Sequence, residues 1–247
     1  MATVLPPDTS VRVVQSTKKP LLKDYENLDQ LLVLMPRRAG EDDWAAVPKG
    51  SRLRKLARRR DAGDVPLVTS RLDNKAQTTV LVATVPAEAS AFERGTVARR
   101  LAAAALAEDP RQLGVLAAGF PDDGTPAIVR DQLLGLLLAA FRLPAFRRKT
   151  AKPPRLATIR LLGLAGRIDA DRVEAEAAGN NLARWLTALP PNVGDARALR
   201  AAGEQLAARH GWQSEFLDTG QLEERGAGAF LAVARGNDND DDGILRL

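Results

Sequence analysis

Glycines at three positions flank a short apolar run near the end of the sequence, as in loops that cradle phosphates. They are Gly226, Gly228 and Gly236. A dinucleotide-binding loop requires a strand before its glycines and a helix after them. Here a charged stretch of helical composition precedes the glycines, and residues 230–233 (FLAV) are typical of a strand. The order is reversed, so we do not expect this segment to bind a phosphate.

Carboxylates alternate along residues 238–242, and Gly243 follows them. This spacing matches the first half of an EF-hand calcium loop. The glutamate that completes such a loop would fall beyond Leu247, and no helix is expected to lead into the segment. We therefore expect a solvated acidic turn between two strands.

Two clusters of basic residues could hold phosphate groups. The first cluster lies on one expected helix and consists of Arg52, Arg54, Lys55, Arg58, Arg59 and Arg60. The second cluster is a basic run that consists of Arg142, Arg147, Arg148, Lys149, Lys152 and Arg155. Neither cluster is interleaved with aromatic residues that could stack on bases. A solvated basic face is the expected role of both.

Residues for covalent or metal-assisted catalysis are scarce. The absence of cysteine excludes a thiolate nucleophile, a disulfide and a zinc site with cysteine ligands. The single histidine, His210, excludes metal motifs with two histidines. It ends an expected helix, where the helix dipole favours a cation, so we expect a structural role. We predict no catalytic, metal-binding or cofactor-binding residue in this chain.

Strands and helices alternate along the first two thirds of the sequence. The expected strands are residues 11–14, 28–35, 77–85, 113–118 and 155–162. The expected helices are residues 51–60, 90–106 and 125–141, the last with Thr125 as N-cap and Pro126 as its first residue. This alternation predicts an α/β domain with a largely parallel or mixed sheet, which ends near residue 166.

A long amphipathic helix is expected next. Asp171 and Glu174 match a capping box, and apolar residues at helical spacing continue to Pro190. Beyond it we expect a helix at 195–210 capped by Gly211, a strand at 214–217, a helix at 221–224, and strands at 230–233 and from 244 onward. We predict three parts: an N-terminal α/β domain (1–166), a linker helix (167–190) and the start of a C-terminal domain (191–247). The sequence stops inside the last strand, which indicates a truncated or cleaved product.

Composition is that of a soluble globular protein. The 247 residues (26.5 kDa) are 45% hydrophobic and 27% charged, with a net charge of +5. No segment has the roughly 18 uninterrupted apolar residues that a membrane span needs, and the first residues are not typical of a secretory signal. We therefore expect a cytoplasmic protein.

Two segments resemble the leucyl (cytosol) aminopeptidase family. Residues 183–192 (ARWLTALPPN) are similar to the segment that opens the family's catalytic domain, although Ala188 and Leu189 stand where the family usually has asparagine. Residues 226–236 (GAGAFLAVARG) resemble the family's Gly-x-Gly-Ala-(Leu/Phe)-Leu-Ala-Val-x-x-Gly segment. The resemblance covers about residues 168–247. Over residues 1–165 the resemblance lies in the expected fold and not in sequence motifs. In this region the family has a three-layer α/β domain that is variable in sequence and similar to macrodomains.

The resemblance implies a hydrolase that releases N-terminal amino acids from peptides. Two divalent cations, manganese or zinc, would polarise the scissile carbonyl, bind the free α-amine and activate a bridging water. The family's enzymes assemble as hexamers. The metal ligands and the catalytic lysine lie in Gly-Lys-Gly-x-x-Phe-Asp-x-Gly-Gly and Asn-Thr-Asp-Ala-Glu-Gly-Arg motifs, which do not occur in this sequence. We expect this chain to be inactive alone, with the catalytic half cleaved off or present as a separate C-terminal chain.

Two alternatives remain open. The basic clusters and the isoelectric point near 9.9 suit a non-catalytic nucleic-acid-binding or regulatory domain, and some members of the family bind DNA. The macrodomain-like first part could bind ADP-ribose, although no Gly-rich strand-to-helix loop favours this.

Overall fold

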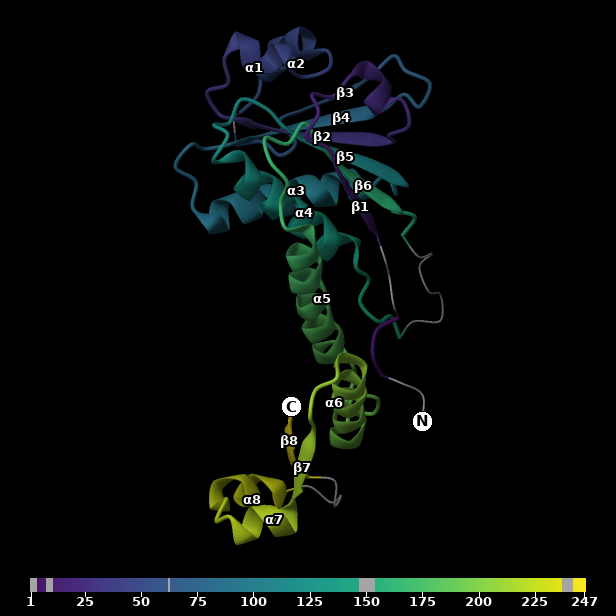
Figure 1. The fold of residues 1–247 in the computed structure, drawn as a ribbon, viewed down its shortest axis with the longest axis vertical. Coiled ribbons are helices and arrows are strands. Elements are labelled where there is room, and N and C mark those ends of the chain that lie inside the picture. Colours follow the sequence, from purple (N-terminus) through teal and green to yellow (C-terminus); the bar gives the residue numbers. More distant parts are fainter. Residues whose placement is uncertain (1–3, 8–10, 62, 147–153, 237–241) are drawn as a thin grey trace. The chain divides into compact units, whose positions relative to one another are not determined.

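The computed structural model describes residues 4–7, 11–61, 63–146, 154–236 and 242–247 (Figure 1). Two compact units are present, Asp8–Asn181 and a second one formed by Met1–Pro7 with Leu182–Leu247. The division falls inside the long helix α5 (Ala170–Thr187). The boundaries expected at 166/167 and 190/191 stay predictions. Among the described residues, no helix is both long and apolar enough to cross a membrane.

The larger unit contains a six-stranded sheet in the order β1-β6-β5-β2-β4-β3. Neighbouring strands are parallel, except that β3 runs antiparallel to β4 at one edge. The strands are β1 (Arg12–Gln15), β2 (Gln30–Pro36), β3 (Val68–Arg71), β4 (Thr79–Val85), β5 (Gln112–Ala117) and β6 (Thr158–Leu162). This confirms the predicted α/β class with a sheet that is mainly parallel.

Strand β2 lies in the middle of this sheet and is buried on both faces. Leu32 and Leu34 pack into one hydrophobic cluster, and Leu31, Val33 and Met35 into a second cluster on the opposite face. A strand covered on both sides is a continuous apolar run rather than an alternating one. This explains why residues 28–35 were identifiable as a buried strand from their composition.

Helices cover both faces, so the unit has three layers. The first cluster contains residues of α3 (Ala91–Leu106), α4 (Thr125–Ala140) and the start of α5. The second contains residues of the 3-10 turn η1 (Leu22–Tyr25), α1 (Glu41–Ala45) and α2 (Gly50–Ala57). Figure 1 shows α1 and α2 on one side of the sheet and α3 and α4 on the other.

The details at two helix starts differ from the expectation. Gly124 precedes α4, so Thr125 is already helical, and its hydroxyl donates to the Pro121 carbonyl at 3.0 Å. Helix α5 begins at Ala170, and the carboxylate of Asp169 accepts from the Arg172 amide at 3.0 Å. The expected caps by Thr125 and Asp171 were therefore wrong, because the capping residue in each case stands further upstream.

The smaller unit contains α6 (Ala196–His210), α7 (Thr219–Glu224) and a two-stranded antiparallel sheet of β7 (Glu215–Asp218) and β8 (Gly243–Arg246). Gly211 caps α6 with φ of 70°, as predicted. The N-terminal segment belongs to this unit, because the Trp185 indole N–H donates to the Val4 carbonyl at 2.7 Å and Leu5 is buried.

The strand expected at residues 230–233 was wrong. These residues lie in helix α8 (Gly228–Ala234). A short apolar run does not distinguish a strand from a helix by its periodicity, and the alanines and leucine here are good helix formers. The expected strands at 214–217 and from 244 onward are confirmed as β7 and β8, within one residue at their starts.

Helices α1 and α2 meet at a turn with almost no free space. Lys49 has a left-handed backbone with φ of 56°, and a Cβ atom at Gly50 would stand 1.6 Å from the Trp44 carbonyl oxygen. This obstacle is backbone, which cannot rotate away as a side chain can. The angle between the two helices therefore depends on glycine at position 50.

We predict opposite stability effects for two glycine substitutions. Gly50→Ala should lower the free energy of unfolding by about 2–3 kcal/mol, because the added methyl group overpacks this turn. Gly95→Ala, on α3 where the added group would meet no other part of the protein within 4 Å beyond its own turn of the helix, should raise it by about 0.5–1 kcal/mol through helix propensity. Urea unfolding followed by circular dichroism measures both. Equal stability of the two variants would contradict this account of the turn.

Candidate functional site

The order of the parallel strands marks one edge of the sheet as the place where such folds bind ligands. The chain passes from β2 to β4 on one side and then returns to β5 on the other side of β2. Open α/β sheets bind ligands beside the carboxyl ends of the strands where the order reverses in this way. Here that place lies between residues 37–40, after β2, and residues 118–124, after β5.

A side chain lies at this place. Asp43 accepts a hydrogen bond from the Gly40 amide at 2.7 Å, which caps the start of α1. A Cβ atom at Gly119, whose φ is +79°, would stand 2.7 Å from the Asp43 carboxyl carbon. The Asp43 carboxylate therefore lies beside the loop that follows β5 at this edge of the sheet. The ADP-ribose alternative stays a prediction.

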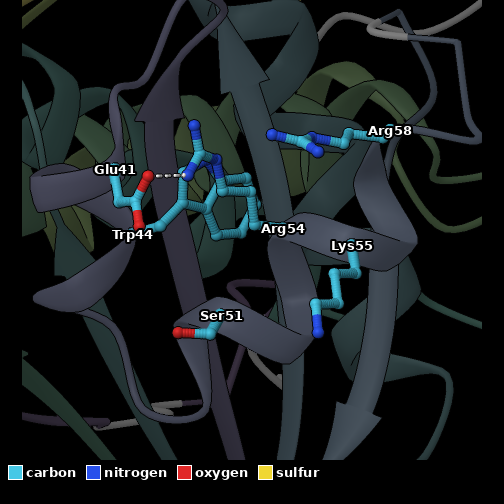
Figure 2. Close-up of a pocket in the computed structure, with 6 residues that line it drawn as sticks. All are labelled: Glu41, Trp44, Ser51, Arg54, Lys55 and Arg58. Carbon is cyan, nitrogen blue, oxygen red and sulfur yellow. Dashed lines mark hydrogen bonds and ion pairs between the residues drawn. The ribbon is translucent and has the colours of Figure 1, made fainter.

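A pocket of about 120 Å³ lies on the outer side of the α1–α2 layer (Figure 2). Helix α2 supplies three of its residues and its C-cap residue supplies a fourth, all at helical spacing, which places them on one face. Helix α1 supplies the other two. The lining consists of Glu41, Trp44, Ser51, Arg54, Lys55 and Arg58.

The pocket residues stand on firmly packed helices. Leu53 is fully buried beneath α2, and Trp44 is only 6% exposed in the same hydrophobic cluster. With the inner face of the helix pair anchored in this way, the polar side chains of the outer face project from a fixed backbone. The pocket is therefore a feature of the fold rather than of a loose loop.

Basic side chains outnumber acidic ones in this pocket. The Arg54 guanidinium donates to the Glu41 carboxylate at 2.7 Å, the contact dashed in Figure 2. The hydrogen bond and charge of Arg54, with a further contribution from Arg58, hold the pKa of Glu41 below its ordinary value. Among the described residues, no ion pair is formed by Lys55 or Arg58. The arrangement can therefore attract an anion.

The first basic cluster predicted from the sequence is thus only partly brought together. Arg54, Lys55 and Arg58 line the pocket. Arg52 lies near the Lys49–Asp73 ion pair, where its charge helps to lower the pKa of Asp73. Glu41 and Trp44 were not predicted as site residues, because α1 was not predicted from the sequence. The signal was present in the acidic triplet that follows Gly40, since acidic residues favour the first turn of a helix.

The other segments singled out in the sequence form no site in the described part of the chain. Residues 147–152 of the second basic cluster and residues 238–241 of the acidic run lie outside the described residues. His210 stacks on Trp212 with 4.8 Å between ring centroids. Within the ranges that the structure describes, no three His, Cys, Asp or Glu side chains are grouped to hold a metal ion.

Comparison with known proteins points to one family. No family model matches the sequence. A probable cytosol aminopeptidase of Synechococcus elongatus is 37% identical over 143 residues, covering 56% of this chain and 29% of the relative. A probable cytosol aminopeptidase of another Synechococcus strain is 35% identical over 156 residues, covering 60% of this chain and 30% of the relative.

Solved structures share the fold. A mutant of tomato leucine aminopeptidase has a TM-score of 0.76 at 18% identity, over 98% of this chain and 52% of the tomato chain. Leucyl aminopeptidase from Trypanosoma brucei has a TM-score of 0.63 at 15% identity, over 89% and 46% of the two chains. The bottromycin maturation enzyme BotP in complex with Mn has a TM-score of 0.61 at 21% identity, over 86% and 43%.

The chain therefore spans about half the length of these solved structures, and its aligned part spans less than a third of the curated relatives. The sequence identities and the shared fold agree with the family named from residues 183–192 and 226–236. The matched lengths of 143 and 156 residues exceed the 80 residues from 168 to 247, so the expectation that residues 1–165 share only the architecture was wrong. This chain is similar in sequence to the cytosol aminopeptidases and has the fold of part of the leucine aminopeptidases.

Proposed function

We propose that this chain forms part of a metal-dependent leucyl-type aminopeptidase that releases N-terminal amino acids from peptides. One observation carries the proposal. The fold matches a leucine aminopeptidase over 98% of the chain, and the curated relatives found independently by sequence are named probable cytosol aminopeptidases. The cytoplasm, a homohexamer and a peptide substrate belong to the same proposal.

The two divalent cations of such an enzyme, manganese or zinc, do not fit the described residues of this chain. No group of three potential ligands is present among them, and the two metal-binding motifs expected from the resemblance do not occur in the sequence. We therefore place both cations on polypeptide outside these residues and assign no catalytic step to this chain. Its proposed role is to form the α/β unit and the first elements of the catalytic domain.

The smaller unit exposes apolar surface, which supports the proposal that a separate catalytic segment packs against this chain. Helix α8 has no buried residue, and Val233 on it is 82% exposed. Ile244 on β8 is 41% exposed. In the described part of the chain β8 pairs only with β7, so its other edge is free. Unpaired edges and exposed apolar side chains are typical of surfaces that another segment covers.

The activity can be tested on the protein in its source cells. An antibody raised against this chain should remove manganese- or zinc-dependent hydrolysis of leucyl-p-nitroanilide from a cell lysate. The purified 247-residue chain should show no such hydrolysis with either metal, because it lacks the ligand motifs. Undiminished activity after complete removal of the chain would contradict the proposal. Hydrolysis by the purified chain would contradict its inactivity alone.

The exposed elements give a second prediction. In the isolated chain, amides of α8 and β8 should exchange with deuterium much faster than amides of β2, because few buried contacts hold them. In the protein captured from cells, the same amides should be protected by the catalytic polypeptide. Hydrogen–deuterium exchange with mass spectrometry compares the two samples. Identical exchange of α8 and β8 in both would argue against a covering polypeptide.

A further inference from the structure

We propose that the pocket between α1 and α2 binds a phosphate group, carried by inorganic phosphate or by a small phosphate monoester. The pocket lies within the larger unit and is independent of the proposed peptidase activity. Its six lining residues come from two short segments, residues 41–44 and 51–58, so the complete site is present in this chain.

The charge of the lining favours a dianion. The lining contains three cations, Arg54, Lys55 and Arg58, and one carboxylate, Glu41, which leaves two positive charges. Glu41 is engaged by Arg54 at 2.7 Å. The described residues provide no ion pair for Lys55 or Arg58, so these two side chains retain the capacity to bind an added anion.

The donors of the lining suit a tetrahedral oxyanion. The Arg58 guanidinium offers a planar fork of N–H groups, the Lys55 ammonium a compact charge with three donors, and Ser51 a hydroxyl. These groups come from one face of α2 and its C-cap, and Trp44 of α1 also lines the pocket. A volume of about 120 Å³ has room for several water-sized groups, and a phosphate is of that size.

Glu41 sets the strength of the site. Its carboxylate takes up donors of Arg54 that a phosphate would otherwise use, and its charge repels the ligand. Removal of that charge without a change in shape should therefore tighten binding. This response distinguishes the pocket from a basic surface that attracts anions without defined contacts.

The test is a titration of the full ¹⁵N-labelled chain with inorganic phosphate at constant ionic strength, followed by NMR. The sequence has three tryptophans and so three indole N–H signals, of which Trp44 reports on the pocket. We expect saturable shifts of the Trp44 indole and of the amides of residues 51–58. A parallel titration with glycerol 3-phosphate shows whether the monoester or free phosphate is the better source.

Variants make the test specific. Lys55→Ala and Arg58→Ala should each weaken binding about fivefold, as expected for the loss of one partly exposed charge contact. Glu41→Gln should tighten it about threefold or more. Arg59→Ala is the matched control, because it removes the same charge from the residue next to Arg58 but does not line the pocket. Its affinity should stay within about twofold of the original.

Three outcomes would overturn the proposal. One is a set of shifts that do not saturate, or that chloride reproduces at equal ionic strength. Another is equal weakening by Arg58→Ala and Arg59→Ala, which would indicate a diffuse basic face. The last is weaker binding by Glu41→Gln while its spectrum shows an intact fold. Because no readout involves peptide hydrolysis, failure here leaves the aminopeptidase proposal unaffected.

Discussion

Burial of β2 on both faces is the constraint on which the larger unit depends. Its side chains enter two separate hydrophobic clusters, so a layer of helices must lie on each side of the sheet. Parallel pairing of β2 with both β4 and β5 then requires connections that cross over the sheet, and these connections are the helices themselves. The three layers therefore follow from the burial of this one apolar strand on both faces.

The same constraint shapes the pocket. The α1–α2 pair must turn Trp44 and Leu53 toward β2, and this rotation leaves Arg54, Lys55 and Arg58 on the outside. Gly50 permits the close approach of α2 to the backbone of Trp44, which brings Glu41 within reach of Arg54. The pocket is thus a consequence of how the second layer packs, and its chemistry comes from the side chains that the core does not use.

Strong local patterns were predictable from the sequence, whereas features that depend on partners in space were not. The buried strands and the capped helices α3 and α6 carry their own signals. The strand β3 has only four residues, and its pairing with β4 comes from tertiary contact. Helix α8 was predicted as a strand because its apolar run is short. For the pocket, the basic residues were identified from the sequence but Glu41 was not. The five residues of α1 are too few for a periodic pattern, and only the acidic triplet after Gly40 marks where this helix begins.

The central claim is that this chain works together with a metal-binding catalytic polypeptide. The most direct measurement is mass-spectrometric sequencing of the native protein captured from its source cells with an antibody against α6. The account predicts peptides that contain both the Gly-Lys-Gly-x-x-Phe-Asp-x-Gly-Gly and the Asn-Thr-Asp-Ala-Glu-Gly-Arg motifs, either in a longer chain or in a second chain of equal abundance. Recovery of peptides from these 247 residues alone, with an intact mass of 26.5 kDa and no second chain, would contradict it.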